Sequence, residues 1–229
     1  MKICGLQKMT LLDFPERVAC TVFLGGCNFR CPYCHNFDLV TGKQPPVLEE
    51  KEFFDFLRTR KGRLDGVAIT GGEPCLSPDL PEFMQKIRDM GFMVKLDTNG
   101  SRPEMLAAIL SQGLADYIAM DIKNSPEKYA MTIGARSVDL TGVTKSVELL
   151  KGSSVACEFR TTVVDELHQA EDFEKIGAWI EGARRYYLQA FSDRDSVPFA
   201  GFHAPSPEKM QAYAKIAAGY VMEVSLRGV

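Results

Sequence analysis

The sequence predicts an α/β protein whose sheet forms a partial, laterally open (β/α)6 barrel. Short strands alternate along the chain with amphipathic helices of about 10–15 residues, a pattern typical of βαβ units and a parallel sheet. The chain holds about six such units, whereas a closed barrel needs eight and about 250 residues. A flat doubly wound sheet is the alternative arrangement of the same units.

Six segments have the apolar, β-branched composition of strands. They are Val18–Leu24, Val67–Thr70, Met93–Leu96, Tyr117–Met120, Val155–Val164 and Tyr186–Leu188. The second, third and fourth are too short and too continuously apolar to have one face in water, which predicts buried parallel strands. A final alternating run, Tyr220–Leu226, predicts a closing strand.

Start and stop signals mark three of the helices between these strands. The predicted helices run from Pro81 to Gly91, from Pro103 to Gly113, and from Ser206-Pro207 to the region of Gly219. Proline in the first turn and glycine past the last turn are the expected helix boundaries.

Composition indicates an ordinary globular protein. The 229 residues include 27 Lys and Arg against 30 Asp and Glu, with 45% hydrophobic and 25% charged residues. These values exclude a disordered chain, a collagen and a disulfide mini-scaffold. The net charge of −3 argues against a general nucleic-acid binder. No linker or low-complexity tract divides the chain, so a single domain over residues 1–229 is expected.

The expected location is the cytoplasm. The N-terminal residues contain no uninterrupted apolar stretch of the kind that signal peptides carry. No apolar run approaches the ~18 residues that span a membrane, so no membrane association is expected.

Polar motifs follow three consecutive predicted strands. They are Gly71-Gly72-Glu73-Pro74, Asp97-Thr98-Asn99-Gly100 and Asp121-Ile122-Lys123, and Arg160 lies within the next strand. The carboxyl ends of parallel strands meet at one face of the sheet, where sites are built. The pattern therefore predicts a functional site at this face, with solvated polar turns as the alternative.

The first strand is followed by three closely spaced cysteines, Cys27, Cys31 and Cys34, in the pattern C-x3-C-x2-C. Iron–sulfur clusters are held by cysteine thiolates, ordinarily four. A loop of this length can place three thiolates at three corners of a [4Fe–4S] cubane. The fourth iron then lacks a protein ligand, and an open coordination position is typical of a catalytic metal site.

Two other interpretations of these cysteines remain open. A zinc site would combine them with His35, His168 or His203, although structural zinc more often uses paired C-x2-C knuckles. Alternatively, the three are unrelated core residues. The isolated Cys4, Cys20, Cys75 and Cys157 are interpreted as small hydrophobic core residues.

The cysteine motif, with Tyr33 as the aromatic residue before Cys34, resembles that of the radical S-adenosylmethionine enzymes. The rest of residues 3–229 resembles their glycyl-radical-enzyme activases. It is closest to the anaerobic ribonucleoside-triphosphate reductase activating proteins and similar to the pyruvate formate-lyase activating enzymes. The matching segments are Leu12-Asp13-Phe14-Pro15, residues 26–36, the three polar motifs above and Arg160-Thr161-Thr162-Val163-Val164.

The resemblance implies an oxidoreductase with the open barrel of the radical S-adenosylmethionine type. Cys27, Cys31 and Cys34 would hold a [4Fe–4S] cluster, and S-adenosylmethionine would bind at the polar face. The implied cofactor-binding residues are Tyr33, Cys34, His35, Gly71, Gly72, Glu73, Asp97, Thr98, Asn99, Asp121, Ile122, Lys123 and Arg160. The glycine pair would approach the ligand closely and offer free backbone N–H groups. The Asp-Thr and Asp-x-Lys positions would also hold a monovalent cation.

The implied reaction abstracts hydrogen from a glycine of a glycyl radical enzyme, so no catalytic residue beyond the cluster and cofactor is required. The implied partners are that enzyme, expected to be anaerobic ribonucleoside-triphosphate reductase, and an electron donor such as flavodoxin or ferredoxin. The exposed stretch Asn124–Leu140 and the loop Ser192–Pro205 are expected to form the rim that contacts the target. Pyruvate formate-lyase activation is an alternative.

The sequence departs from the activase pattern at two places. Tyr187–Phe191 lacks the histidine that pyruvate formate-lyase activating enzymes carry after the sixth strand, and Gln189 or Phe191 is expected to replace it. Glu16 stands where these families usually have glycine. Three other functional classes are weighed: a small-molecule radical enzyme such as 7-carboxy-7-deazaguanine synthase, an electron-transfer protein, and a zinc-stabilised interaction module.

Overall fold

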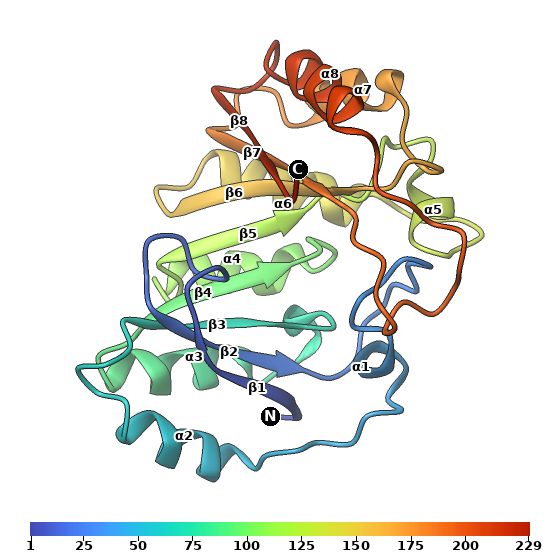
Figure 1. The fold of residues 1–229 in the computed structure, drawn as a ribbon. Helices are drawn as coiled ribbons and strands as arrows, with labels where there is room; N and C mark the ends of the chain where they lie inside the picture. Colours follow the sequence, from blue (N-terminus) through green and yellow to red (C-terminus); the bar gives the residue numbers. More distant parts are fainter.

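One eight-stranded sheet forms the centre of the computed structural model, which describes all 229 residues (Figure 1). The strands lie in chain order; β1 is antiparallel to β2, and β2 to β8 are parallel. Their bounds are β1 Ile3–Thr10, β2 Ala19–Leu24, β3 Gly66–Gly71, β4 Met93–Thr98, β5 Tyr117–Asp121, β6 Ala156–Val163, β7 Arg185–Ala190 and β8 Glu223–Arg227.

Helices occupy the connections between the parallel strands. They are α1 Phe37–Thr41, α2 Glu50–Arg58, α3 Leu80–Asp89, α4 Pro103–Ser111, α5 Tyr129–Thr132, α6 Thr141–Lys151, α7 Ala170–Trp179 and α8 Pro207–Ala217, with a 3₁₀ turn at Pro74–Leu76. Figure 1 shows α3 and α4 behind the sheet and α7 and α8 beside its β7–β8 end. No helix is long and apolar enough to cross a membrane.

The arrangement confirms the laterally open α/β fold. Each of the strands β2 to β7 is followed by a helical connection to the next strand, which gives six βα units. The sheet does not close, because β1 and β8 are its two edges. The alternative of a flat doubly wound sheet is wrong, since such a sheet reverses its strand order at a switch point and this one does not.

Two strands differ from the sequence prediction. β1 was not predicted, because its residues ICGLQKMT lack a regular apolar alternation; it is an edge strand that pairs only with β2. β8 begins at Glu223, later than the predicted Tyr220. Tyr220 instead packs on α7, where a Cβ added to Gly177 would lie 2.4 Å from the Tyr220 ring.

The loop between β1 and β2 closes the amino-terminal end of the sheet. Phe14 of this loop is buried and packs with Ala19, Tyr117 and Ala119. A Cβ on Gly66 would lie only 2.8 Å from the Phe14 ring, so the first residue of β3 must be glycine for the ring to fit. The amino-terminal end of the sheet is thus filled by an aromatic side chain, which leaves the carboxyl end as the open end where a polar site can form.

Glu16 is the one non-glycine residue with a positive φ, 61°. The left-handed conformation costs a residue with a Cβ about 1–2 kcal/mol, whereas glycine adopts it freely. We expect Glu16→Gly to raise the free energy of unfolding by about 0.5–1 kcal/mol in urea denaturation of the metal-free protein. Arg17→Gly, at an exposed neighbour with ordinary φ, should lower it. Stabilisation by both variants, or by neither, would contradict the assignment of strain to Glu16.

Candidate functional site

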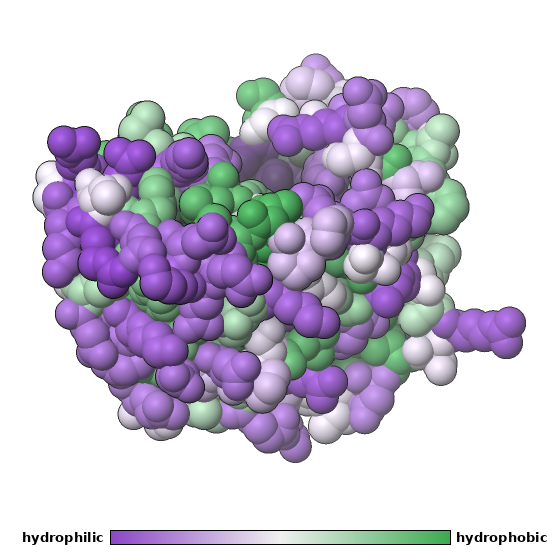
Figure 2. Space-filling model, turned by 90° about the horizontal axis from the view of Figure 1, so that it is seen from below, coloured by the Kyte–Doolittle hydropathy of each residue, from purple (hydrophilic) through white to green (hydrophobic).

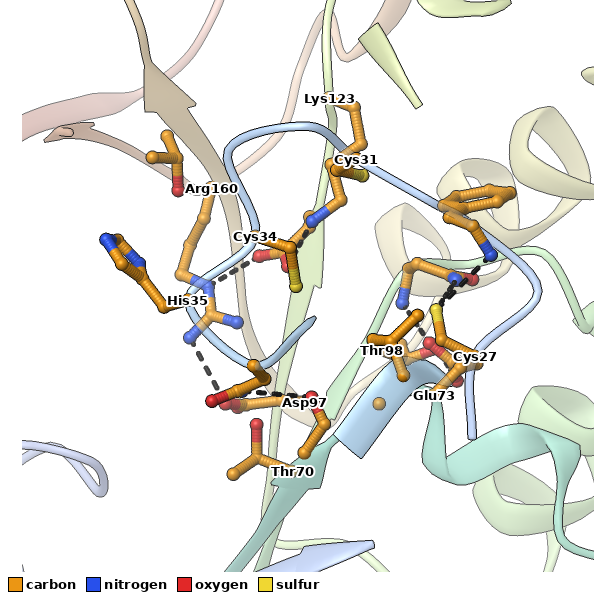
Figure 3. A pocket seen from close by; sticks show the side chains of 18 of the residues that line it. Cys27, Cys31, Cys34, His35, Thr70, Glu73, Asp97, Thr98, Lys123 and Arg160 are labelled. Atoms are coloured by element: carbon orange, nitrogen blue, oxygen red, sulfur yellow. Dashed lines mark hydrogen bonds and ion pairs between the residues drawn. The ribbon is translucent and has the colours of Figure 1, made fainter. Parts of the chain in front are cut away.

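The three clustered cysteines lie on the loop between β2 and α1. Backbone hydrogen bonds hold this loop at its start and at its middle: Gly26 N–H donates to Leu39 O at 3.0 Å, and Arg30 N–H donates to Ile133 O at 2.9 Å. The side chains of Cys27, Cys31 and Cys34 line the same cavity at the carboxyl end of the sheet (Figure 3). The loop thus directs all three thiols to one space.

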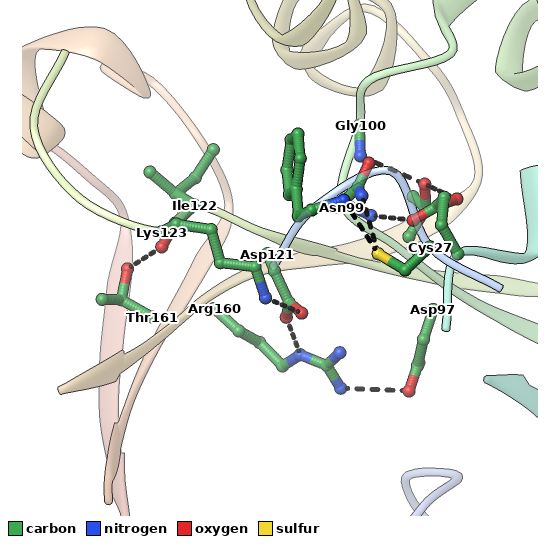
Figure 4. Close-up of polar contacts among 12 residues, drawn as sticks. Cys27, Asp97, Asn99, Gly100, Asp121, Ile122, Lys123, Arg160 and Thr161 are labelled. Carbon is green, nitrogen blue, oxygen red and sulfur yellow. Dashed lines mark hydrogen bonds and ion pairs between the residues drawn. The ribbon is translucent and has the colours of Figure 1, made fainter. Parts of the chain in front are cut away.

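The cavity has a volume of about 280 Å³ and gathers the polar motifs of three strands. Every residue that the sequence analysis predicted for the site lines it, with one exception. The exception is Ile122, which is fully buried in the hydrophobic core. Its backbone N–H donates to Arg160 O, and its carbonyl accepts from Thr161 Oγ1 (Figure 4). Ile122 therefore supports the site from behind.

Glu73 joins the end of β3 to the end of β4. Its Oε1 accepts hydrogen bonds from Thr98 Oγ1 at 2.8 Å and from Cys75 N–H at 2.9 Å, and its Oε2 accepts from Asn99 N–H at 2.6 Å. The carboxylate is 2% exposed, and burial raises its pKa. Both carboxylate oxygens already accept hydrogen bonds from the protein. Glu73 therefore holds the cavity wall together by connecting β3 to the residues that follow β4.

Asn99, in turn, contacts the cysteine loop. Its Nδ2 donates to Asn28 Oδ1 at 3.0 Å and lies 3.9 Å from Cys27 Sγ (Figure 4). The Cys27 sulfur also accepts from Phe29 N–H at 3.3 Å. Hydrogen bonds to cluster sulfurs are one of the factors that set the reduction potential of an iron–sulfur cluster.

The sequence predicts that the glycine pair offers free N–H groups to a ligand. In the structure the pair instead serves the packing of the protein. The Gly72 N–H donates to Leu24 O, and the Glu73 N–H donates to Gly26 O, both at 2.8 Å. A Cβ on Gly72 would lie 1.9 Å from Gly26 O. Gly71 has a φ of +118°, and its carbonyl accepts from Asn36 Nδ2 at 3.0 Å. The pair thus fixes the cysteine loop against β3.

Five charged side chains form a network, and four of them, Asp97, Asp121, Lys123 and Arg160, line the cavity. Asp121 Oδ2 is 2.9 Å from Lys123 Nζ, and its Oδ1 accepts from Arg160 Nε at 2.9 Å. The Arg160 Nη1 is 3.4 Å from Asp97 Oδ2 (Figures 3 and 4). Lys95 pairs with the other Asp97 oxygen. The alternative of a solvated surface ion pair does not describe Asp121 and Lys123, whose side chains are 29% and 17% exposed.

The network fixes the charge state of its members. Burial alone would raise the pKa of Asp121, but the charges of Arg160 and Lys123 hold it below its usual range. Burial would also raise the pKa of Asp97, and Arg160 and Lys95 lower it. Burial disfavours a charged Lys123, yet Asp121 raises its pKa well above the usual value. Lys123 and Arg160 therefore remain cations with unused N–H donors, which suits them to a ligand carboxylate.

The three thiols fit a metal cluster. Burial raises the pKa of Cys31 to about 12, and it also raises the pKa values of Cys27 and Cys34. Thiolates are the metal-ligating form, and a bound metal deprotonates a coordinating thiol. These buried thiols, aimed into one cavity, are thus suited to bind iron, whose charge would compensate for their burial.

A mononuclear zinc site does not fit the geometry. No three His, Cys, Asp or Glu side chains converge closely enough to bind a single metal ion. His168 is buried, with its ring nitrogens next to Val164 and to Lys123 O, and His203 pairs with Glu166. In a [4Fe–4S] cluster each cysteine thiolate binds a different iron, so the three sulfur atoms need not converge on one metal ion. The arrangement of Cys27, Cys31 and Cys34 is therefore compatible with a cluster.

An unsatisfied hydroxyl marks the aromatic side of the cavity. Tyr33 Oη is buried without a hydrogen-bond partner, and buried hydroxyls are ordinarily paired. The Tyr33 ring packs edge-on against Phe191 and Phe202, and His35 stacks on Phe191 at 5.4 Å. The His35 Nε2 is 2.6 Å from Ser192 O. Of these rings, Tyr33 and His35 line the cavity, so they are the aromatic groups available to the nucleoside of S-adenosylmethionine.

Several cavity residues were not among the predicted site residues. They are Asp13, Phe29, Asn36, Val40, Thr70 and Thr162. Of the two residues expected in place of the family histidine, Gln189 lines the cavity and Phe191 does not. Thr162 could have been found from its alternation with Arg160 along one strand, and Thr70 from its place just before the glycine pair. Asp13 comes from the β1–β2 loop, where its Oδ2 accepts from Thr21 Oγ1 at 2.5 Å.

The expectation that Asn124–Leu140 is an exposed rim is partly wrong. Asn124, Ser125 and Tyr129 are fully buried. The Asn124 amide donates to Thr132 Oγ1 and Leu167 O, and Ser125 Oγ donates to Asp172. These polar side chains find partners within the fold, so they belong to the core. Pro126, Glu127 and Met131 are exposed, and a longer exposed run begins at Gly134.

The Radical SAM superfamily matches residues 21–180, a stretch that contains the cysteine loop and all three polar motifs. The chain belongs to the radical SAM superfamily. Membership implies a [4Fe–4S] cluster and S-adenosylmethionine as cofactors, and the residues of the cavity fit both. The protein is therefore a radical SAM enzyme.

Relatives of this radical SAM enzyme include proteins with different assigned activities. A Methanocaldococcus jannaschii protein assigned as a glycyl-radical enzyme activating enzyme is 31% identical over 99% of this chain and 96% of its own length. The pyruvate formate-lyase-activating enzyme of Clostridium pasteurianum is 31% identical over 54% of this chain and 52% of its own. A Pyrococcus abyssi protein assigned as a GTP 3′,8-cyclase is 30% identical over 54% and 41%.

Solved structures of radical SAM enzymes share the fold. A domain of a pyruvate-formate lyase-activating enzyme from Bacteroides vulgatus aligns with a TM-score of 0.58 and 16% identity over 71% of this chain and 99% of that one. Streptococcus suis SuiB aligns with a TM-score of 0.68 and 13% identity, over 91% of this chain and 48% of its own.

Lys123→Ala is expected to weaken S-adenosylmethionine binding about tenfold or more while leaving the iron content unchanged. The variant removes a charged donor, and hydrogen bonds to charged groups contribute about 1.5–3 kcal/mol. Asp121→Ala should also weaken binding, because it releases Lys123 and Arg160 from their positions. Lys128→Ala, which breaks an ion pair with Asp172 outside the cavity, is the matched control. Equilibrium dialysis with the reconstituted protein measures the affinity for S-adenosylmethionine. Unchanged affinity in both site variants would show that this network does not bind the cofactor.

Proposed function

We propose that this radical SAM enzyme is a glycyl-radical-enzyme activase and that its partner is an anaerobic ribonucleoside-triphosphate reductase. The observation that carries the activase assignment is the similarity to the M. jannaschii protein, which extends over 99% of this chain. The GTP 3′,8-cyclase relative aligns with about half of the chain. The choice of reductase rests on the resemblance of the sequence motifs.

The open sheet supports a protein substrate. A glycine within a large folded enzyme can reach the cavity only if its loop enters this protein, and the sheet leaves its edges β1 and β8 unpaired with each other. Seen from below, the surface is hollowed between polar and apolar side chains (Figure 2). A loop that becomes ordered on docking pays an entropic cost, so a short free peptide should bind weakly.

The chain's own residues would bind, orient and shield the reactants. When bound, the cluster and cofactor supply the electron and the sulfonium whose reductive cleavage allows hydrogen abstraction. Lys123 and Arg160 would bind the cofactor carboxylate, and the cavity-lining rings of Tyr33 and His35 would flank its nucleoside. Glu73 and the glycine pair would hold the cysteine loop in place. No side chain is required to move a proton.

The test is anaerobic mixing of the reconstituted protein with S-adenosylmethionine, a reductant and one candidate partner at a time. The candidates are an anaerobic ribonucleoside-triphosphate reductase and a pyruvate formate-lyase. Electron paramagnetic resonance should show a glycyl doublet with the reductase, in a roughly one-to-one complex. A doublet with the lyase alone would reassign the partner and keep the activase function.

A different result would overturn the activase proposal itself. Slow cleavage of S-adenosylmethionine without partner is expected, because the residues that would bind the cluster and the cofactor all belong to this chain. Turnover that a small purine nucleotide accelerates, with no protein partner present, would instead indicate a small-molecule radical SAM enzyme.

A further inference from the structure

A basic surface patch covers the outer side of the cysteine loop. We call it the arginine patch; it consists of Arg30 on the loop, Met131 and Arg136 on the segment that the Arg30 N–H contacts at Ile133 O, and Arg102. All three arginines are exposed, and Met131 is 54% exposed. The whole chain has a net charge of −3, so the three arginines make this part of the surface positive on a protein that is negative overall.

Contacts join the cysteine loop to the two segments that carry the other arginines. Gly134 packs on Arg30, since a Cβ on Gly134 would lie 2.3 Å from Arg30 O and 3.4 Å from Arg30 Cβ. This contact places Arg136, two residues further on, beside the loop. On the other side, Asn28 Nδ2 donates to Ser101 Oγ at 2.9 Å, which places Arg102 next to the loop as well.

The patch lies over the thiols with little protein between them. Asn28 and Arg30 are the exposed residues between Cys27 and Cys31, and the Arg30 guanidinium donates to Cys27 O and Phe29 O. Cys27 itself is partly exposed. The patch therefore includes a residue of the loop itself, close in the chain to Cys27 and Cys31.

No acidic side chain of the protein pairs with the charges of the patch. None of the three arginines forms an ion pair, in contrast to Arg88, Arg160 and Arg227. Asp139, the acidic residue nearest Arg136 along the chain, accepts a hydrogen bond from Thr141 N–H. Unpaired like charges near each other repel, so such a patch suits a partner that brings negative charge.

We propose that the arginine patch is the docking surface for a small acidic electron-transfer protein. This inference rests on the proposed radical SAM chemistry, which needs one electron for each cleavage. In the step at this surface the reduced donor loses one electron and the cluster gains it, with no bond made or broken. The apolar Met131 would form the dry centre of the contact and the arginines its charged rim.

The test compares two double variants of the reconstituted protein. Arg102→Glu/Arg136→Glu reverses two charges of the patch and leaves Arg30 in place because it supports the cysteine loop. Lys61→Glu/Arg63→Glu reverses two exposed charges just before β3, at the opposite end of the sheet. Stopped-flow bleaching of the cluster absorbance by reduced flavodoxin gives the second-order rate constant, and dithionite serves as a reductant that needs no docking.

The patch variant should be reduced by flavodoxin about tenfold more slowly at low ionic strength, with the difference fading at high salt. The control variant should match the unmodified protein, and dithionite should support S-adenosylmethionine cleavage in all three. Equal slowing by both variants, or no slowing by either, would overturn the docking proposal. Impaired partner activation in the patch variant with dithionite as reductant would also overturn it, because the patch would then bind the glycyl radical enzyme. Failure of dithionite cleavage in the unmodified protein would instead count against the proposed function.

Discussion

Single replacement of Cys27, Cys31 or Cys34 with Ala should abolish cleavage of S-adenosylmethionine. Each thiol lines the same cavity and would hold one iron, so loss of any one leaves a second iron without its protein ligand. The measurement is iron and sulfide content after anaerobic reconstitution, together with formation of 5′-deoxyadenosine. Both should fall to background in each variant, which is the largest effect expected of any substitution in this chain.

Cys75→Ala is the matched control for these variants. Cys75 is buried beside the site, 3% exposed, and does not line the cavity. Its replacement removes one buried sulfur atom, which should lower the free energy of unfolding by about 1–2 kcal/mol and leave the iron content intact. Loss of iron from Cys75→Ala would show that the three-cysteine ligand set is wrong.

Gly72→Ala should be the most damaging substitution outside the cysteines. The added methyl group would lie 1.9 Å from Gly26 O, a backbone atom that no side-chain rotation can move away. Overpacking typically costs about 1–3 kcal/mol, and a backbone clash belongs at the upper end of that range. Relief of the clash would displace the cysteine loop from β3, so cluster content should fall together with stability.

Gly152→Ala separates this clash from the general effect of adding a methyl group. Gly152 follows α6 with an ordinary φ of −82°, and the nearest atom to an added Cβ is 3.4 Å away. Urea denaturation of the metal-free proteins and iron content after reconstitution should both match the unmodified protein for Gly152→Ala. Full cluster content in Gly72→Ala would contradict the role assigned to the glycine pair.

The sequence predicts the parallel strands and the site because both depend on local patterns. Continuous apolar runs identify β3, β4 and β5, and the polar motifs directly after them lie at one edge because parallel strands share a direction. The cysteine spacing alone places three thiols on one short loop. Alternation along β6 places Arg160 on the interior face, where it joins Asp97 and Asp121.

Features that depend on distant contacts could not be predicted in this way. The edge strand β1 has no alternating pattern, and its position follows from pairing with β2. Glu73 is adjacent to the glycine pair in sequence, but its role comes from Thr98 and Asn99 on the next strand. Ile122 stands between two cavity residues and points away because successive side chains alternate between the faces of extended backbone.

The most direct test of the central claim follows the hydrogen atom. The partner enzyme is prepared with glycine deuterated at Cα and mixed anaerobically with this protein, reductant and S-adenosylmethionine. Mass spectrometry of the 5′-deoxyadenosine should then show one added deuterium, formed together with the glycyl doublet. Unlabelled 5′-deoxyadenosine at the same yield, with no radical on the partner, would contradict the account, because the hydrogen would then come from a source other than the glycine.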